Sequence, residues 1–177
     1  SYAGCDYVTK ITFPESFEYS YPNSIDDTAF YKNKENWENG VLYLGKVLYE
    51  ADPEDLVGEY TIKEGTIRIV DQSFVGCQKL TKLTIPGSVD FIPFKTFMNC
   101  PELTDLTLEE GITVIQPSAF VNCKKLVNIK LPKSLTEVFQ GVFTGTGYYN
   151  NIYNWDDGGL YLDNILLDVD PECWGEL

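Results

Sequence analysis

Cysteine is the residue type in this chain whose spacing most suggests chemistry. Five cysteines are present, and Cys77, Cys100 and Cys123 follow one another at intervals of 23 residues. Cys5 fits the same sequence pattern further upstream. In a stack of extended coils, neighbouring Cα atoms would lie about 5 Å apart, which is within reach of a disulfide. If all four side chains point into the core, they instead behave as small buried hydrophobic groups, and we favour this interpretation.

Other reactive side chains offer little support for catalysis or metal binding. The chain has no histidine, which removes the commonest general base and most transition-metal sites, and no CxxC pair supports a zinc site. Two carboxylate clusters could suit calcium, but they lack the spacing of known calcium loops, and an exposed acidic rim is the favoured interpretation. They are Asp52, Glu54, Asp55 and Asp168, Asp170, Glu172. We expect no catalytic residue, no metal and no cofactor.

These residues sit in a repeated sequence that must position them. FVGCQKLTKLTIPGSVDFI at 74–92 aligns without a gap with FMNCPELTDLTLEEGITVI at 97–115 and FVNCKKLVNIKLPKSLTEV at 120–138. Apolar residues recur in the same columns, above all Phe74, Phe97, Phe120 and Phe143 beside the cysteines. A 23-residue unit cannot bury all these faces alone, so neighbouring units must stack into a solenoid.

Each unit divides into three expected segments. Residues 80–85 alternate as a short strand of a parallel sheet, and residues 89–92 are extended on the opposite wall. Residues 95–100 and 118–123 are expected to turn the corner as a helical turn. A weaker copy extends upstream through Tyr2, Cys5, Val8, Ile11, Phe13, Phe17, Ile25 and Phe30.

Two longer coils carry an insertion that is itself repeated. NWENGVLYLGKVLYEADPEDLVGE begins at Asn36, and NWDDGGLYLDNILLDVDPECWGEL begins 118 positions later. The pairs Gly45-Lys46 and Asp163-Asn164 fit two-residue hairpin turns of the primed types. We expect one domain over 1–177, with regular coils at 74–142 and hairpin-bearing coils at 30–73 and 143–177, as part of a longer protein.

The outward positions of the predicted sheet form two polar columns. The first holds Lys10, Glu59, Lys82, Asp105 and Asn128, and the second holds Thr12, Thr61, Thr84, Thr107 and Lys130. Such columns can be cross-strand pairs that stabilise the sheet. They can also form the concave binding surface that solenoids often use, and Lys82, Thr84, Asp105, Thr107, Asn128 and Lys130 are therefore the candidate ligand-binding residues.

Aromatic residues gather in the irregular coils, where they could anchor a partner. They are Tyr19, Tyr21, Tyr31, Trp37 and Tyr148, Tyr149, Tyr153, Trp155, Trp174. Trp37 and Trp155 occupy equivalent repeat positions, so both are expected to pack their hairpins onto the stack. Exposed tyrosines are the better candidates for binding.

Net charge narrows the class of partner. The chain carries −14 in total, with −8 over residues 1–73, +1 over 74–142 and −7 over 143–177. This balance argues against nucleic acid and against anionic membranes. No apolar run is long enough to span a membrane, so direct membrane insertion is not expected.

The order F-x-x-C-x-x-L-x-x-L-x-I-P-x-x-V-x-x-I, with G-V-L-Y hairpin insertions, resembles the BspA-like leucine-rich-repeat family over nearly the whole chain. Thr146 and Thr66 depart from its cysteine and valine columns. The resemblance implies an α/β leucine-rich-repeat solenoid that is right-handed and mostly β, with short helical turns and a concave parallel sheet. It also implies a secreted or surface-attached bacterial protein, and some members bind host proteins.

We therefore expect a non-enzymatic, extracellular module for protein interaction or adhesion that acts as a monomer and binds a protein ligand, such as a host protein. Two other functions stay open. Parallel solenoids also include carbohydrate-binding and carbohydrate-active proteins, although no inward-facing acidic pair is found in the regular coils. The chain could also be a structural spacer in a larger surface protein.

Overall fold

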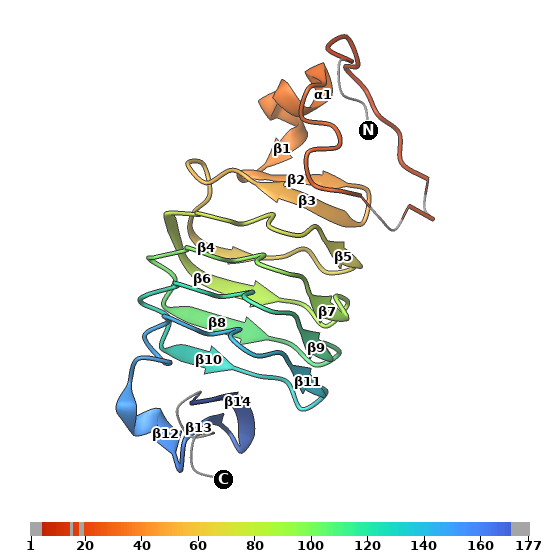
Figure 1. Cartoon of the computed structure of the whole chain (residues 1–177). Coiled ribbons are helices and arrows are strands. Elements are labelled where there is room, and N and C mark those ends of the chain that lie inside the picture. Colours follow the sequence, from red (N-terminus) through yellow and green to blue (C-terminus); the bar gives the residue numbers. More distant parts are fainter. Residues whose placement is uncertain (1–4, 15, 18–19, 171–177) are drawn as a thin grey trace.

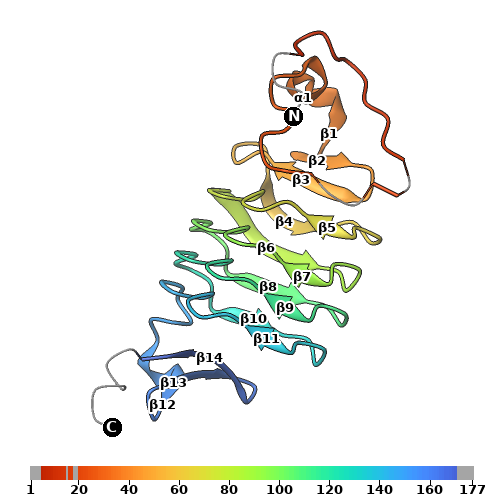
Figure 2. The ribbon, with the colours of Figure 1, turned by 45° about the vertical axis from the view of Figure 1, so that its right-hand side comes forward.

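The computed structural model describes residues 5–14, 16–17 and 20–170, and it shows an elongated stack of coils (Figure 1). Each coil contributes one strand to a main parallel sheet and a shorter strand to an opposite wall, as the 23-residue period predicted (Figure 2). The predicted solenoid, mostly β with a parallel sheet, is confirmed. The predictions for Tyr2, Tyr19, Glu172 and Trp174 concern residues outside the described part of the chain.

The main sheet contains β4 (Val57–Thr61), β6 (Lys79–Ile85), β8 (Asp105–Leu108) and β10 (Asn128–Lys130), in the order β10-β8-β6-β4. All pairs are parallel, and the 23-residue period sets their register. Leu83 lies opposite Leu106, and Leu106 lies opposite Ile129. Side chains alternate between the core and the outer face, so the repeat places equivalent residues in straight columns.

The opposite wall contains β7 (Phe91–Ile92), β9 (Val114–Ile115) and β11 (Glu137–Val138), again in parallel. Its equivalent one coil earlier, β5 (Arg68–Ile69), pairs in parallel with the hairpin strand β3 (Val47–Ala51). The first hairpin therefore takes the place that a preceding coil would hold on this wall.

The corners between coils are hydrogen-bonded turns and not the predicted helical turns. Two columns of residues in these turns have positive φ, and the backbone there reverses direction without a helix. They are Gln72, Lys95, Ser118, Gly141 and Gly76, Asn99, Asn122, Gly145. Among the described residues, the helices are α1 (Ala29–Lys32), η1 (Lys34–Asn36) and η2 (Ile152–Asn154), and all lie just before the hairpins.

The two predicted hairpins are present. The first contains β1 (Trp37–Glu38), β2 (Val41–Leu44) and β3, and the second contains β12 (Trp155–Asp156), β13 (Gly159–Leu162) and β14 (Ile165–Val169). Asp163 and Asn164 both have positive φ, the sign pattern of a type I′ turn. At the first turn only Gly45 does, the pattern of type II′. The prediction of primed turns is confirmed.

The main core runs along the stack. Phe74, Phe97, Phe120 and Phe143 are buried, and their successive ring centroids lie 4.7, 5.2 and 5.4 Å apart. A second cluster lies at the other side of the first hairpin, where Leu42, Leu44 and Val47 pack against Phe13 and Phe30. The first hairpin thus contributes side chains to both hydrophobic clusters.

The upstream copy of the repeat does not form strands within the described residues. Residues 8–13 have no ladder partner, and Ile11 and Phe13 pack on the first hairpin. The hairpin separates this segment from β4, so it cannot extend the main sheet. The prediction that Lys10 and Thr12 continue the outward columns is therefore wrong.

Candidate functional site

The outer face of the main sheet brings together the six candidate residues. Lys82 and Thr84 lie on β6, Asp105 and Thr107 on β8, and Asn128 and Lys130 on β10. The register places them in two rows that cross the strands: Lys82 opposite Asp105 and Asp105 opposite Asn128, and Thr84 opposite Thr107 and Thr107 opposite Lys130. The residues between them, such as Leu83 and Leu106, are buried. The alternation predicted from the sequence is therefore present.

The first row is a ladder of paired polar groups. Lys82 Nζ lies 2.6 Å from Glu59 Oε1, and Asn128 Nδ2 donates to Asp105 Oδ1 at 3.0 Å. A hydrogen bond from Thr104 and one from Asn128 hold the pKa of Asp105 below its ordinary value, while contact with Glu59 raises the pKa of Lys82. These groups are largely engaged with one another, which matches the stabilising interpretation of the column.

The second row is left free for contact. Within the described part of the chain, the side chains of Thr84 and Thr107 have no hydrogen-bond partner, and Lys130 has neither an ion pair nor a hydrogen bond. Lys130 is also exposed on the last strand of the sheet. The hydroxyl groups and this ammonium group are therefore the part of the face most available to a ligand.

A hollow of about 360 Å³ lies at the β10 end of this face. Its polar lining includes Asp105, Thr107, Asn128 and Lys130, and its apolar lining includes Val127, Ile129 and Leu162. Leu162 comes from β13, so the second hairpin forms one side of the hollow. Sequence reasoning did not identify Leu162, because only the fold brings the hairpin beside β10, and it did not single out Val127, which directly precedes β10.

The cysteine column faces the core, as predicted. Cys77, Cys100 and Cys123 are fully buried and free, whereas Cys5 is half-buried and free. The thiol of Cys100 donates to the carbonyl of Phe74 at 3.2 Å, and that of Cys123 to the carbonyl of Phe97 at 3.0 Å. The neighbouring Cys100 thiol, together with burial, raises the pKa of Cys123 well above its ordinary value. These thiols are poor nucleophiles and ligands.

The carboxylates of the first acidic cluster have structural partners. Asp52 forms an ion pair with Lys34 and accepts from the amides of Glu54 and Asp55, and these contacts lower its pKa. In the second cluster, Asp168 accepts from the amides of Gly141 and Val169. Among the described residues, no group of three or more cysteine, aspartate or glutamate side chains could hold a metal ion.

The aromatic residues of the hairpin coils divide into two groups. Trp37 Nε1 donates to the carbonyl of Tyr31 at 2.8 Å, and Trp155 Nε1 donates to that of Tyr149 at 2.7 Å. Trp155 packs against the main core, as predicted, whereas Trp37 packs against the second cluster, on the other side of the first hairpin. Tyr153 is 89% exposed, and it is the clearest aromatic candidate for a contact with a partner.

The described part of the chain contains no helix long and apolar enough to cross a membrane. No curated protein matches the chain.

Several solved leucine-rich-repeat structures resemble the chain. The match to a protein from Eubacterium ventriosum has 22% identity and a TM-score of 0.46, and covers 66% of this chain and 35% of that one. A T. pallidum protein gives 20% identity and a TM-score of 0.41, with 55% and 58% covered. A Bacteroides ovatus protein gives 24% identity and a TM-score of 0.39, with 51% and 29% covered. The chain thus spans about a third of the length of the first of these proteins.

The repeat pattern itself matches a family model. The model describes a BspA type leucine-rich-repeat region, and six copies of it match over residues 55–157. These residues include the main sheet, its opposite wall and the start of the second hairpin. Because the match covers more than half of the chain, the chain belongs to the BspA-type leucine-rich-repeat family.

Proposed function

We propose that this chain is a non-enzymatic, extracellular module that binds a protein ligand on the outer face of its main sheet. Leucine-rich repeats of this type generally serve protein interaction, and their proteins are typically secreted or exposed on bacterial surfaces. The ligand would contact Thr84, Thr107 and Lys130 directly, with Lys82, Asp105 and Asn128 beside them.

The observation that carries the proposal is the hollow at the β10 end of the face. It combines the free ammonium group of Lys130 with hydroxyl, carboxylate and amide groups, and with the apolar side chains of Val127 and Leu162. Val127 is 49% exposed although it is apolar. A protein side chain that is apolar in its body and polar at its tip would match this mixture, as anchor residues of interfaces commonly do.

The charge distribution favours a ligand with basic edges. The central coils carry +1, whereas the two flanks carry −8 and −7. Attraction to the flanks would accelerate encounter with such a ligand, and association should slow as salt shortens the Debye length to about 8 Å at physiological ionic strength.

The absence of enzymatic activity is part of the proposal. In the two acidic clusters, Asp52 is engaged by Lys34 and Asp168 by backbone amides. Reproducible turnover of a glycan that one carboxylate substitution abolishes would contradict this part.

The test is binding to a panel of extracellular-matrix proteins and glycans, followed by a variant with Lys82→Ala, Asp105→Ala and Lys130→Ala. We expect affinity for a protein in the panel to fall while the melting temperature falls only slightly, because all three side chains point away from the core and an exposed cross-strand pair contributes less than about 1 kcal/mol. The matched control changes the exposed residues Asp90, Lys124 and Lys133, which gives the same charge change away from this face. Equal affinity in the parent and the first variant would exclude the sheet face.

A further inference from the structure

The two hairpins are copies of one unit, and their internal contacts match closely. In each copy the tryptophan indole bonds to the carbonyl six residues earlier, as Trp37 does to Tyr31 and Trp155 to Tyr149. In each copy, the amide that follows the last strand also donates a hydrogen bond to a glycine carbonyl. The amide of Asp52 donates to Gly40 at 2.7 Å, and the amide of Asp170 donates to Gly158 at 2.8 Å. A difference in their surroundings is therefore informative.

The edge of the last strand is paired in one copy and open in the other. Strand β3 pairs in parallel with β5, with Val47 opposite Arg68 and Leu48 opposite Ile69. The equivalent strand β14 pairs with β13 only, as far as the described residues extend.

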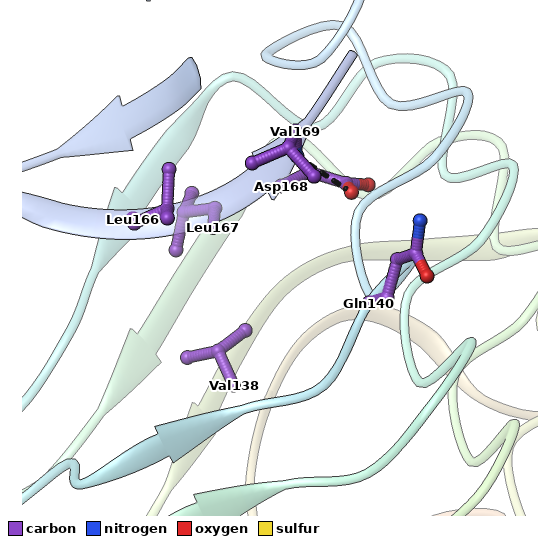
Figure 3. Close-up of a pocket in the computed structure, with 6 residues that line it drawn as sticks. All are labelled: Val138, Gln140, Leu166, Leu167, Asp168 and Val169. Atoms are coloured by element: carbon purple, nitrogen blue, oxygen red, sulfur yellow. Dashed lines mark hydrogen bonds between the residues drawn. The ribbon is translucent and has the colours of Figure 1, made fainter. Parts of the chain in front are cut away.

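One amide shows this difference directly. The amide of Ala51 donates to the carbonyl of Ser73, in the following coil, at 2.7 Å. The equivalent amide of Val169 instead donates to the side chain of its neighbour Asp168 at 2.9 Å (Figure 3). In the second hairpin the side chain of Asp168 accepts from this amide, whereas in the first hairpin a carbonyl of the following coil accepts from it.

The faces of the two hairpins differ in the same way. Leu48 is fully buried in the main core with Ile62 and Ile69, whereas its equivalent Leu166 is 46% exposed. Tyr43 bonds through its hydroxyl to Tyr60 at 2.9 Å, whereas its equivalent Tyr161 is 41% exposed. Exposed apolar side chains of this kind, beside an open strand edge, mark a surface that another element can cover.

A hollow beside the strand shows which element is missing. In the first copy a hollow of about 110 Å³ is lined by Pro22, Asn23, Tyr49 and Glu50, and the following coil closes it with Asp71, Gln72 and Ser73. In the second copy the hollow is about 330 Å³, and it is lined by Val138, Gln140 and Leu166–Val169 (Figure 3). Gln140, Leu167 and Asp168 lie 118 positions after Pro22, Tyr49 and Glu50, and among the described residues none takes the place of Asp71 to Ser73.

We propose that the open edge of β14 and the exposed face around Leu166 and Tyr161 receive a further leucine-rich coil of the same polypeptide, built like residues 57–73. The coil would pair in parallel with Ile165 and Leu166 and bury Leu166 as β5 buries Leu48. The sequence supports this occupant, because residues 171–177 (PECWGEL) repeat PEDLVGE at 53–59, which leads from the first hairpin into its covering coil. The second hairpin would then lie inside the stack, with one coil packed on each of its two faces.

The test compares the full chain with the same chain extended after Leu177 by a second copy of residues 60–119. Both carry Leu166→Cys, with Cys5→Ser and Cys173→Ser to remove other accessible thiols. We expect maleimide to label Leu166→Cys rapidly in the parent chain and about tenfold or more slowly in the extended chain. Hydrogen exchange at the Val169 amide should slow in parallel, toward the rate at Ala51.

Two controls make the result specific. Tyr153→Cys, at a position that is 89% exposed, should label rapidly in both chains. An extension whose copies of Ile62 and Ile69 are aspartate should leave Leu166→Cys reactive, because it cannot bury the hairpin face. Equal labelling of Leu166→Cys in all three chains would overturn the proposal. Slow labelling in the parent that depends on protein concentration would also overturn it, since a second copy of the chain would then cover this face.

Discussion

Phe97 and Phe120 stack with their ring centroids 5.2 Å apart and their planes within 5° of parallel. Phe74 lies on the other side of Phe97 at 4.7 Å, so the Phe97 ring is packed on both faces. Such a position has no neighbour that can move to fill a gap, because the coils above and below are fixed by two parallel walls.

Replacing Phe97 by alanine should therefore reduce the free energy of unfolding by about 3–5 kcal/mol, the usual cost of emptying a buried aromatic site. Urea unfolding of the parent and the variant measures this change. Phe94→Ala is the control, because Phe94 lies three residues before Phe97 and is 37% exposed. Its effect on the free energy of unfolding should be clearly smaller. Similar losses for both variants would contradict the central role of the stack.

The buried cysteines should be unreactive while the protein is folded. Cys77, Cys100 and Cys123 are fully buried, and the neighbouring Cys100 thiol, together with burial, raises the pKa of Cys123. In a Cys5→Ser, Cys173→Ser background, a thiol reagent should label no cysteine in the native protein and three after denaturation. Rapid native labelling, or a disulfide found by mass spectrometry, would show that the column is accessible or cross-linked.

The corner turns should depend on Asn122. Its φ is 61°, and its side chain donates to Asn99 at 3.1 Å, one coil above. Asn122→Ala should cost about 1 kcal/mol or more, because an alanine is strained in this left-handed conformation. Asn122→Gly loses the side-chain bond but fits the backbone, so it should retain more stability than alanine. The reverse order in thermal melts would show that the backbone conformation is not what matters.

Glu50 should give stability a measurable pH dependence. Burial raises its pKa, although the hydroxyl of Tyr31 donates to it at 2.8 Å and opposes the shift. Asp26 and Asp52 raise the pKa further, and Lys34 lowers it. A raised pKa in the folded state means that the stabilising contribution is complete below the unfolded pKa and is lost as pH rises through the folded value.

Glu50→Gln should therefore stabilise the protein at about pH 7 and leave stability unchanged at about pH 4, because the glutamine can still accept from Tyr31. Melting temperatures at the two pH values measure this. Glu64→Gln, at an exposed position, is the control and should show no such difference. A loss of stability at neutral pH would mean that the ionised carboxylate is favourable in this site.

Some of these features could be predicted from the sequence, and the reason is the period. Phe97 and Cys100 recur every 23 residues, so stacking alone places them in one interior column and places Lys82 beside Asp105 on the outer face. The hairpin turn at Asp163-Asn164 can also be predicted from the sequence, because aspartate and asparagine tolerate positive φ.

Other features were hidden because they depend on contacts that the period does not describe. Gln72, Lys95 and Ser118 have positive φ, although their residue types give no such signal. The corner was therefore predicted to be helical. The hollow beside Lys130 depends on Leu162, which lies 32 residues further along the chain and comes into contact only through the hairpin.

The first hairpin lies between two hydrophobic clusters, and this arrangement affects the order in which the molecule unfolds. Leu48 belongs to the core of the regular coils, whereas Leu42 and Leu44 belong to the separate cluster of Ile11, Phe13 and Phe30. The first hairpin lies between the two clusters, and Val70 of the following coil also belongs to the second one, so the two clusters can differ in local stability. The N-terminal cluster can thus unfold separately while the phenylalanine column stays intact. The first hairpin would then form the end of a shorter, still ordered stack.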